Sequence, residues 1–140
     1  MLKESSDRAP SSQKIKKIEG INPNAIGGTI KATIDGKECK VPVGTTILEA
    51  AKSLGIRIPT LCHHEDLCVA GNCRVCVVEQ VGMRTLQASC ATPVRENMQI
   101  LTNSMLVRQA RKTIIELLLS EHNADCTKCY KNGKCELQDL

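Results

Sequence analysis

Apolar and polar residues alternate at the start of the patterned part of the chain, which begins near Thr29. The apolar members of the alternation are Ile30, Ala32, Ile34, Val41 and Val43. Asp35-Gly36 interrupts them with a two-residue turn signal. Because successive side chains of a strand point to opposite faces, this pattern predicts a β-hairpin with one buried face.

A helical spacing replaces the alternation after the hairpin. Thr46 and Glu49 form a capping box, and Gly55 is suited to end the helix. The apolar stripe between them consists of Ile47, Leu48, Ala51 and Leu54. Further along, strands are predicted at 75–81, 86–90 and 98–101, with Gly82 in a turn. A hairpin, a helix across it and additional strands describe an α+β fold of the β-grasp type, the architecture of plant-type ferredoxins.

A second helix is predicted from a cap at Asn103 or Ser104 through Leu119. Its apolar face comprises Val107, Ala110, Ile114, Leu117 and Leu118, and its charged face Arg108, Arg111, Lys112 and Glu116. We expect the apolar face to pack on the first domain rather than in a membrane or a partner's groove. The expected domains are therefore a flexible tail (1–27), a ferredoxin-like domain (28–102), and a helix with a short cysteine-rich segment (103–140). An arm that orders on a partner subunit is the alternative for the tail.

Composition limits the function classes. Tyr130 is the only Phe, Trp or Tyr residue, so almost no side chain can stack on the bases of a nucleic acid. The formal charge of +4 treats all nine cysteines as neutral, whereas metal-bound thiolates would lower it. We therefore expect no nucleic-acid partner. The first residues lack the apolar stretch of an export signal, and no apolar run approaches membrane-spanning length, so the expected location is the reducing cytoplasm.

The cysteines carry the candidate chemistry. Cys62, Cys73, Cys76 and Cys90 are separated by ten, two and thirteen residues, a set that can hold a 2Fe-2S cluster. Cys68 competes with Cys62, because its spacing to Cys73 also fits a ferredoxin. Cys62 is preferred because it directly follows the segment ending in Pro59-Thr60, whereas Cys68 lies in an apolar stretch. Zinc is the alternative metal, although only one C-x2-C unit is present here.

A second donor set follows the predicted long helix. It consists of His122, Cys126, Cys129 and Cys135, four possible ligands within a short segment. On spacing alone, a structural zinc ion and an iron-sulfur cluster are equally good occupants. Outside the two sets, Cys39 is expected to be a free thiol, and His63 and His64 are expected to be loop residues. Arg74, next to Cys73, is either a solvated side chain or a cation that stabilises a reduced cluster. The lysines Lys128, Lys131 and Lys134 are expected to be solvated, and a docking face for an acidic redox partner is the alternative.

The two cysteine-rich segments carry a family resemblance. The stretches are IPTLCHHEDLCVAGNCRVCVVE, LQASCATPV, ILTNS and HNADCTKCYKNGKCELQDL. Together they resemble the N-terminal iron-sulfur segment of the complex I iron-sulfur subunit, of FeFe hydrogenases and of NAD-dependent formate dehydrogenases, over about residues 28–138. The resemblance implies a 2Fe-2S cluster on Cys62, Cys73, Cys76 and Cys90, and a 4Fe-4S cluster on His122, Cys126, Cys129 and Cys135. Cys68 departs from the family pattern.

The resemblance also implies a function. We expect a non-catalytic electron-relay subunit between a flavin- and NAD(H)-binding subunit and another redox subunit, with ferredoxin as a possible further partner. No dinucleotide or phosphate-binding glycine motif is present. The first expectation is an electron-bifurcating NADH/ferredoxin/NADP transhydrogenase, and the alternative is a bifurcating hydrogenase or formate dehydrogenase complex. A zinc-binding structural protein and a free soluble ferredoxin are the two competing classes.

Overall fold

The computed structural model describes residues 28–140, so the predicted N-terminal tail lies outside the described residues. The elements in chain order are β1 (Thr29–Ile34), β2 (Lys37–Pro42), α1 (Ile47–Ser53), β3 (Val77–Gln80), β4 (Gln87–Ala88), β5 (Met98–Leu101) and α2 (Met105–Ser120). Neither helix in this part of the chain is both long enough and apolar enough to cross a membrane.

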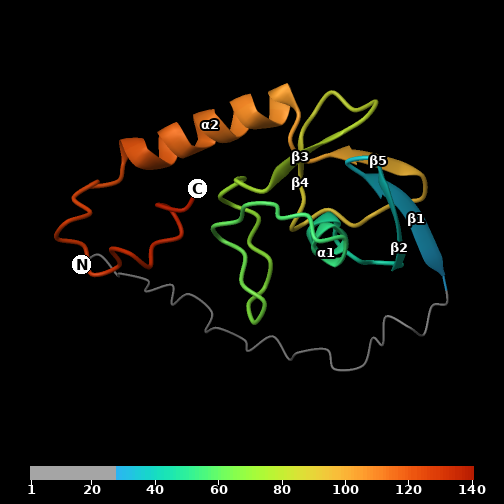
Figure 1. Ribbon diagram of the computed structural model, residues 1–140, viewed down its shortest axis with the longest axis horizontal. Helices are drawn as coiled ribbons and strands as arrows, with labels where there is room; N and C mark the ends of the chain where they lie inside the picture. Colours follow the sequence, from blue (N-terminus) through green and yellow to red (C-terminus); the bar gives the residue numbers. More distant parts are fainter. Residues whose placement is uncertain (1–27) are drawn as a thin grey trace, which may run out of the picture.

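The strands form one mixed sheet in the order β2-β1-β5-β3-β4 (Figure 1). Strands β1 and β2 pair antiparallel, with Ile34 opposite Lys37, while β1 and β5 run parallel. Asp35 and Gly36 have φ values of 49° and 80°, as a hairpin turn with two left-handed positions requires. The predicted hairpin and the α+β ferredoxin-like fold are confirmed.

Helix α1 packs against the sheet and closes the core. Its capping box is present: the Thr46 hydroxyl accepts a hydrogen bond from the Glu49 N–H, and the Glu49 carboxylate accepts one from the Thr46 N–H. These bonds satisfy N–H groups that the first turn of a helix leaves free. The side chains that α1 packs against the sheet belong to a cluster of buried residues that includes Ile34, Ile47, Ala50, Ala51, Val78 and Ile100.

Two strands are shorter than predicted. The expected strand at 75–81 is paired only over Val77–Gln80, and the one at 86–90 only over Gln87–Ala88. Val75 and Cys76 are buried but lie in a turn that follows Arg74, whose φ is 58°. The apolar residues there reflect burial and not strand pairing, because Val75 and Cys76 lie in a turn and form no part of the paired strand.

Helix α2 begins at Ser104, whose hydroxyl accepts from the Val107 N–H and donates to the Glu79 carboxylate. The prediction that its apolar face packs on the first domain is wrong for Leu117, whereas Ala110, Ile114 and Leu118 are half-buried. Val107 is fully buried, but Leu117 is 65 % exposed, since the helix extends beyond the sheet after its first turns (Figure 1). The assignment of Arg111 to the solvent face is also wrong, because its side chain is half-buried against β3.

The segment after α2 turns back under the helix toward the loop that follows α1 (Figure 1). Glu136, Asp139 and Leu140 line a shared pocket with 57–60, directly before Cys62. The two cysteine-rich segments are therefore neighbours in space although they are far apart in the chain.

Candidate metal centres

The structure brings Cys62, Cys73, Cys76 and Cys90 together as two pairs of thiols. The Sγ atoms of Cys76 and Cys90 lie 3.3 Å apart, and both residues are 2 % exposed. On the other side, the backbone N–H of Cys73 donates a hydrogen bond to the Cys62 sulfur. Two thiolates that share one tetrahedral metal at 2.3 Å lie about 3.8 Å apart, so the Cys76–Cys90 pair is close to that spacing.

The fold fixes the Cys76–Cys90 pair through the backbone. The Ser89 N–H donates to the Cys76 carbonyl at 3.2 Å, and the Ser89 carbonyl accepts from the Leu48 N–H at 3.1 Å. The turn before β3, the segment after β4 and the start of α1 are thereby joined beside the thiols. In the other pair, Cys73 closely follows Gly71, whose φ is 63°. A glycine adopts this conformation at no steric cost.

The four thiols differ electrostatically. The backbone N–H of Cys73 lowers the pKa of Cys62, because a donated hydrogen bond stabilises the thiolate. Burial, the hydrogen bond with Cys76 and the like charges of Cys76, Cys62 and Cys73 together raise the pKa of Cys90 to about 12, with burial the largest cause. A thiol of this kind stays protonated at neutral pH unless a cation replaces its proton. The set therefore needs a positively charged core to become four thiolates.

Cys68 lies outside this group. It is exposed at the tip of the loop, between Leu67 and Val69, which are 68 % and 48 % exposed. Cys39 is buried in β2 as a member of the hydrophobic core. The structure thus favours Cys62 over Cys68 as the neighbour of Cys73.

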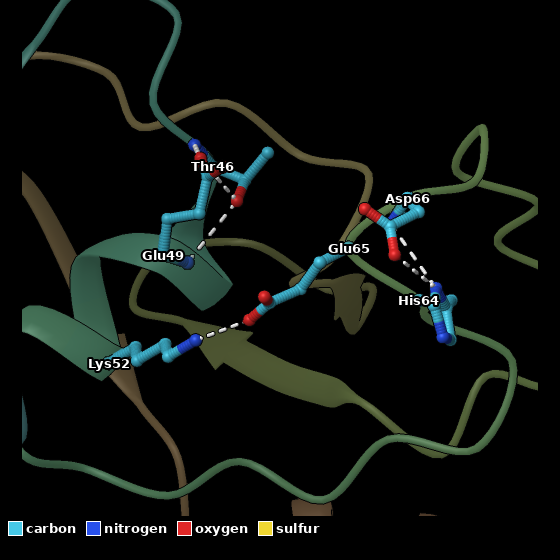
Figure 2. A network of polar contacts seen from close by, with 6 residues as sticks. All are labelled: Thr46, Glu49, Lys52, His64, Glu65 and Asp66. Atoms are coloured by element: carbon cyan, nitrogen blue, oxygen red, sulfur yellow. Dashed lines mark hydrogen bonds and ion pairs between the residues drawn. The ribbon is translucent and has the colours of Figure 1, made fainter.

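Polar contacts attach the loop to α1, as Figure 2 shows. Lys52 on α1 forms an ion pair with Glu65 at 2.6 Å, which raises the pKa of Lys52 and lowers that of Glu65. Both side chains are largely exposed, so water screens the pair and it orients the loop more than it stabilises it. His64 contacts Asp66 at 3.8 Å within the loop (Figure 2).

The second donor set lines one cavity of about 160 Å³ beyond the end of α2. Its walls are Leu119, His122, Ala124, Cys126, Cys129, Asn132, Cys135, Leu137 and Gln138, so all four predicted donors are present. The Cys129 N–H donates to the Cys126 carbonyl at 3.2 Å, which makes the tight turn that a two-residue gap requires. His122 Nδ1 accepts from the Ala124 N–H at 3.0 Å.

The donor groups fit iron-sulfur clusters in kind, because thiolates and imidazoles are the protein ligands of such clusters. Within residues 28–140, no three His, Cys, Asp or Glu side chains converge closely enough to hold a single metal ion. Two side-chain atoms in the same part of the chain are buried without a hydrogen-bond partner, Ser89 Oγ and His63 Nδ1. Each belongs to a residue adjacent to a predicted ligand, Cys90 and Cys62. A ferredoxin-like sheet that carries a buried pair of thiols, with two half-buried thiols beside it, defines an iron-sulfur protein of the 2Fe-2S ferredoxin class.

Comparison with known families specifies this class. Residues 27–105 match the family described as "2Fe-2S iron-sulfur cluster binding domain", and residues 111–140 match the "NADH-ubiquinone oxidoreductase-G iron-sulfur binding region". The first match covers more than half of the chain, so the chain belongs to the 2Fe-2S iron-sulfur cluster binding domain family. The predicted cofactors, one 2Fe-2S and one 4Fe-4S cluster, are confirmed at the level of these two regions, and zinc is not supported.

Several proteins are similar to this chain over most of its length. The "NADP-reducing hydrogenase subunit HndD" of Solidesulfovibrio fructosivorans is 58 % identical over 113 residues, covering 77 % of this chain and 19 % of the relative. The "NADH-ubiquinone oxidoreductase 75 kDa subunit" of Reclinomonas americana is 47 % identical, covering 79 % and 16 %. The chain thus spans less than a fifth of these relatives.

A solved structure supports the same fold. The chain from "Crystal structure of NAD+-reducing [NiFe]-hydrogenase in the H2-reduced state" matches with a TM-score of 0.71 and 39 % identity, over 78 % of this chain and 46 % of the other. The predicted family resemblance is therefore confirmed both by sequence and by structure.

Proposed function

We propose that this chain is an electron-relay subunit of a multisubunit oxidoreductase. In this proposal Cys62, Cys73, Cys76 and Cys90 hold a 2Fe-2S cluster, and His122, Cys126, Cys129 and Cys135 hold a 4Fe-4S cluster. The observation that carries the proposal is the coexistence of both donor groups on neighbouring segments, one around a buried thiol pair and one around a cavity. Clusters of these types exchange single electrons when bound.

Residues at the two sites favour cluster binding through their charge and burial. The Cys73 N–H favours the thiolate of Cys62, and the burial of Cys76 and Cys90 excludes water from one side of the first site. Each of the two thiol pairs would serve one of the two irons. At the second site, one neutral imidazole with three thiolates gives a less negative ligand set than four thiolates.

The partners proposed for this relay are a flavin- and NAD(H)-binding subunit and a further redox subunit, with ferredoxin as an additional donor or acceptor. An electron-bifurcating NADH/ferredoxin/NADP transhydrogenase in the cytoplasm is our first proposal for the complex. A hydrogenase complex is the second candidate, because the relatives named above include an NADP-reducing hydrogenase subunit and an NAD+-reducing hydrogenase.

The test begins with the purified chain and its metal content. We expect iron, acid-labile sulfide and visible absorption without stoichiometric zinc, and two distinct EPR signals after reduction. The flavin-free chain should not reduce a dye with NADH, and activity should appear only with partner subunits. Reproducible NADH-dependent dye reduction by the chain alone would contradict the relay role.

Copurification from the native host distinguishes a relay subunit from a free soluble carrier. A relay subunit should elute with flavin-containing partners, whereas a diffusing ferredoxin should elute as a monomer. The same experiment identifies the complex, because a transhydrogenase and a hydrogenase differ in their associated metal centres.

A further inference from the structure

Arg111 of α2 reaches the backbone beside the first candidate cluster site. Its Nε donates to the Val75 carbonyl at 3.2 Å, and its Nη2 donates to the Val77 carbonyl at 2.7 Å. These two carbonyls flank Cys76, which belongs to the buried thiol pair. A guanidinium can make both bonds at once because its donors form a rigid planar fork.

The positive charge of Arg111 is held in a partly dehydrated position. Burial lowers its pKa, while the Cys76 thiol and the Asp35 carboxylate act in the opposite direction. The group still remains protonated, because an arginine in a protein does not lose its proton. Arg111 takes part in none of the ion pairs formed by residues 28–140. Its charge is therefore neither neutralised by a contacting carboxylate nor fully screened by water.

A cluster held by four thiolates is anionic, and reduction adds one more negative charge without making or breaking a bond in the protein. A nearby fixed cation stabilises the reduced form more than the oxidised form, because the Coulomb energy scales with the charge of the cluster. Charge, hydrogen bonding and exposure around a cluster are the means by which a protein sets its potential.

We propose that Arg111 is a positioning residue that fixes the Cys76 segment and raises the reduction potential of the 2Fe-2S cluster. This inference rests on the proposed function. Arg74, which is nearer to the cysteines in sequence, is a weaker candidate because its side chain is exposed. Arg111 also lies on α2, and His122 follows the end of this helix. The hydrogen bonds of Arg111 to the Val75 and Val77 carbonyls therefore also position the second donor set relative to the first.

The experiment is a redox titration of the full chain, with both clusters assembled, followed by EPR. Arg111→Gln removes the charge and keeps a hydrogen-bond donor, Arg111→Met keeps the apolar stem alone, and Arg111→Lys keeps the charge without the fork. Arg108→Gln is the matched control, since Arg108 lies on the same helix and is exposed. We expect Arg111→Gln and Arg111→Met to disfavour reduction of the 2Fe-2S cluster by about tenfold, a fall of about 59 mV for one electron.

Arg108→Gln should leave the potential at the wild-type value, and Arg111→Lys should fall between wild type and Arg111→Gln. Assembly of the cluster in Arg111→Lys but not in the two uncharged variants would also support the charge role. Equal potentials in wild type and Arg111→Gln would overturn it, as would loss of the cluster in all three Arg111 variants while Arg108→Gln assembles. Absence of any cluster in the wild-type chain would instead refute the proposed function.

Discussion

The choice between Cys62 and Cys68 can be tested with one pair of serine substitutions. Cys62 accepts a hydrogen bond from the Cys73 N–H and contributes to the electrostatic environment of Cys90, so it belongs to the thiol group. Cys68 is exposed on the loop and takes part in none of these contacts. Cys62→Ser therefore removes a member of the proposed ligand set, whereas Cys68→Ser replaces a surface thiol by a hydroxyl of similar size.

The expected magnitudes follow from this placement. With both clusters assembled, a chain carries about six iron atoms, and without the first cluster it carries about four. Cys68→Ser should retain six, and its free energy of unfolding should change by no more than about 0.5 kcal/mol, as for other surface substitutions. Cys62→Ser should fall toward four iron atoms and should lose or alter the 2Fe-2S EPR signal.

The assay combines iron and sulfide determination with EPR of the reduced protein, and the unaltered signal of the second cluster serves as the internal control for folding. The reverse pattern, with the signal lost in Cys68→Ser and retained in Cys62→Ser, would refute the assignment. Such a result would require the loop tip to fold inward on cluster binding.

Two further predictions concern the second site and α2. His122→Cys should retain the 4Fe-4S cluster at a lower potential, because a thiolate adds one negative charge, and His122→Ala should leave it labile; an unchanged potential and EPR spectrum in His122→Cys would show that His122 is not a ligand. Val107→Ala should reduce the free energy of unfolding by about 1–3 kcal/mol, since Val107 is fully buried between α2 and the sheet. Leu117→Ala, at a position that is 65 % exposed, should change it by less than about 0.5 kcal/mol, and equal losses in urea unfolding would contradict the observed path of α2.

Local signals in the sequence were sufficient for most of the fold. The Asp35-Gly36 turn, the Thr46–Glu49 capping box and the Ser104 cap each depend on residues within a few positions of one another. Short segments therefore determine these conformations, which can be predicted without the tertiary structure. The cofactor classes were also accessible, but at the second site the family resemblance, and not the spacing of His122 and the cysteines, favoured an iron-sulfur cluster over zinc.

Tertiary structure alone decided the features that depend on distant segments. The burial of Val107 and the exposure of Leu117 depend on where α2 leaves the sheet, which its regular apolar spacing does not encode. Arg111 had no sequence signal beyond its i+4 spacing from Val107, and only the packing of α2 on β3 places its guanidinium on the carbonyls beside Cys76. Cys62 and Cys68 have equally plausible spacings, and the sequence preferred Cys62 only because it follows Pro59-Thr60. The folded loop adds that Cys62 lies beside Cys73 whereas Cys68 is exposed.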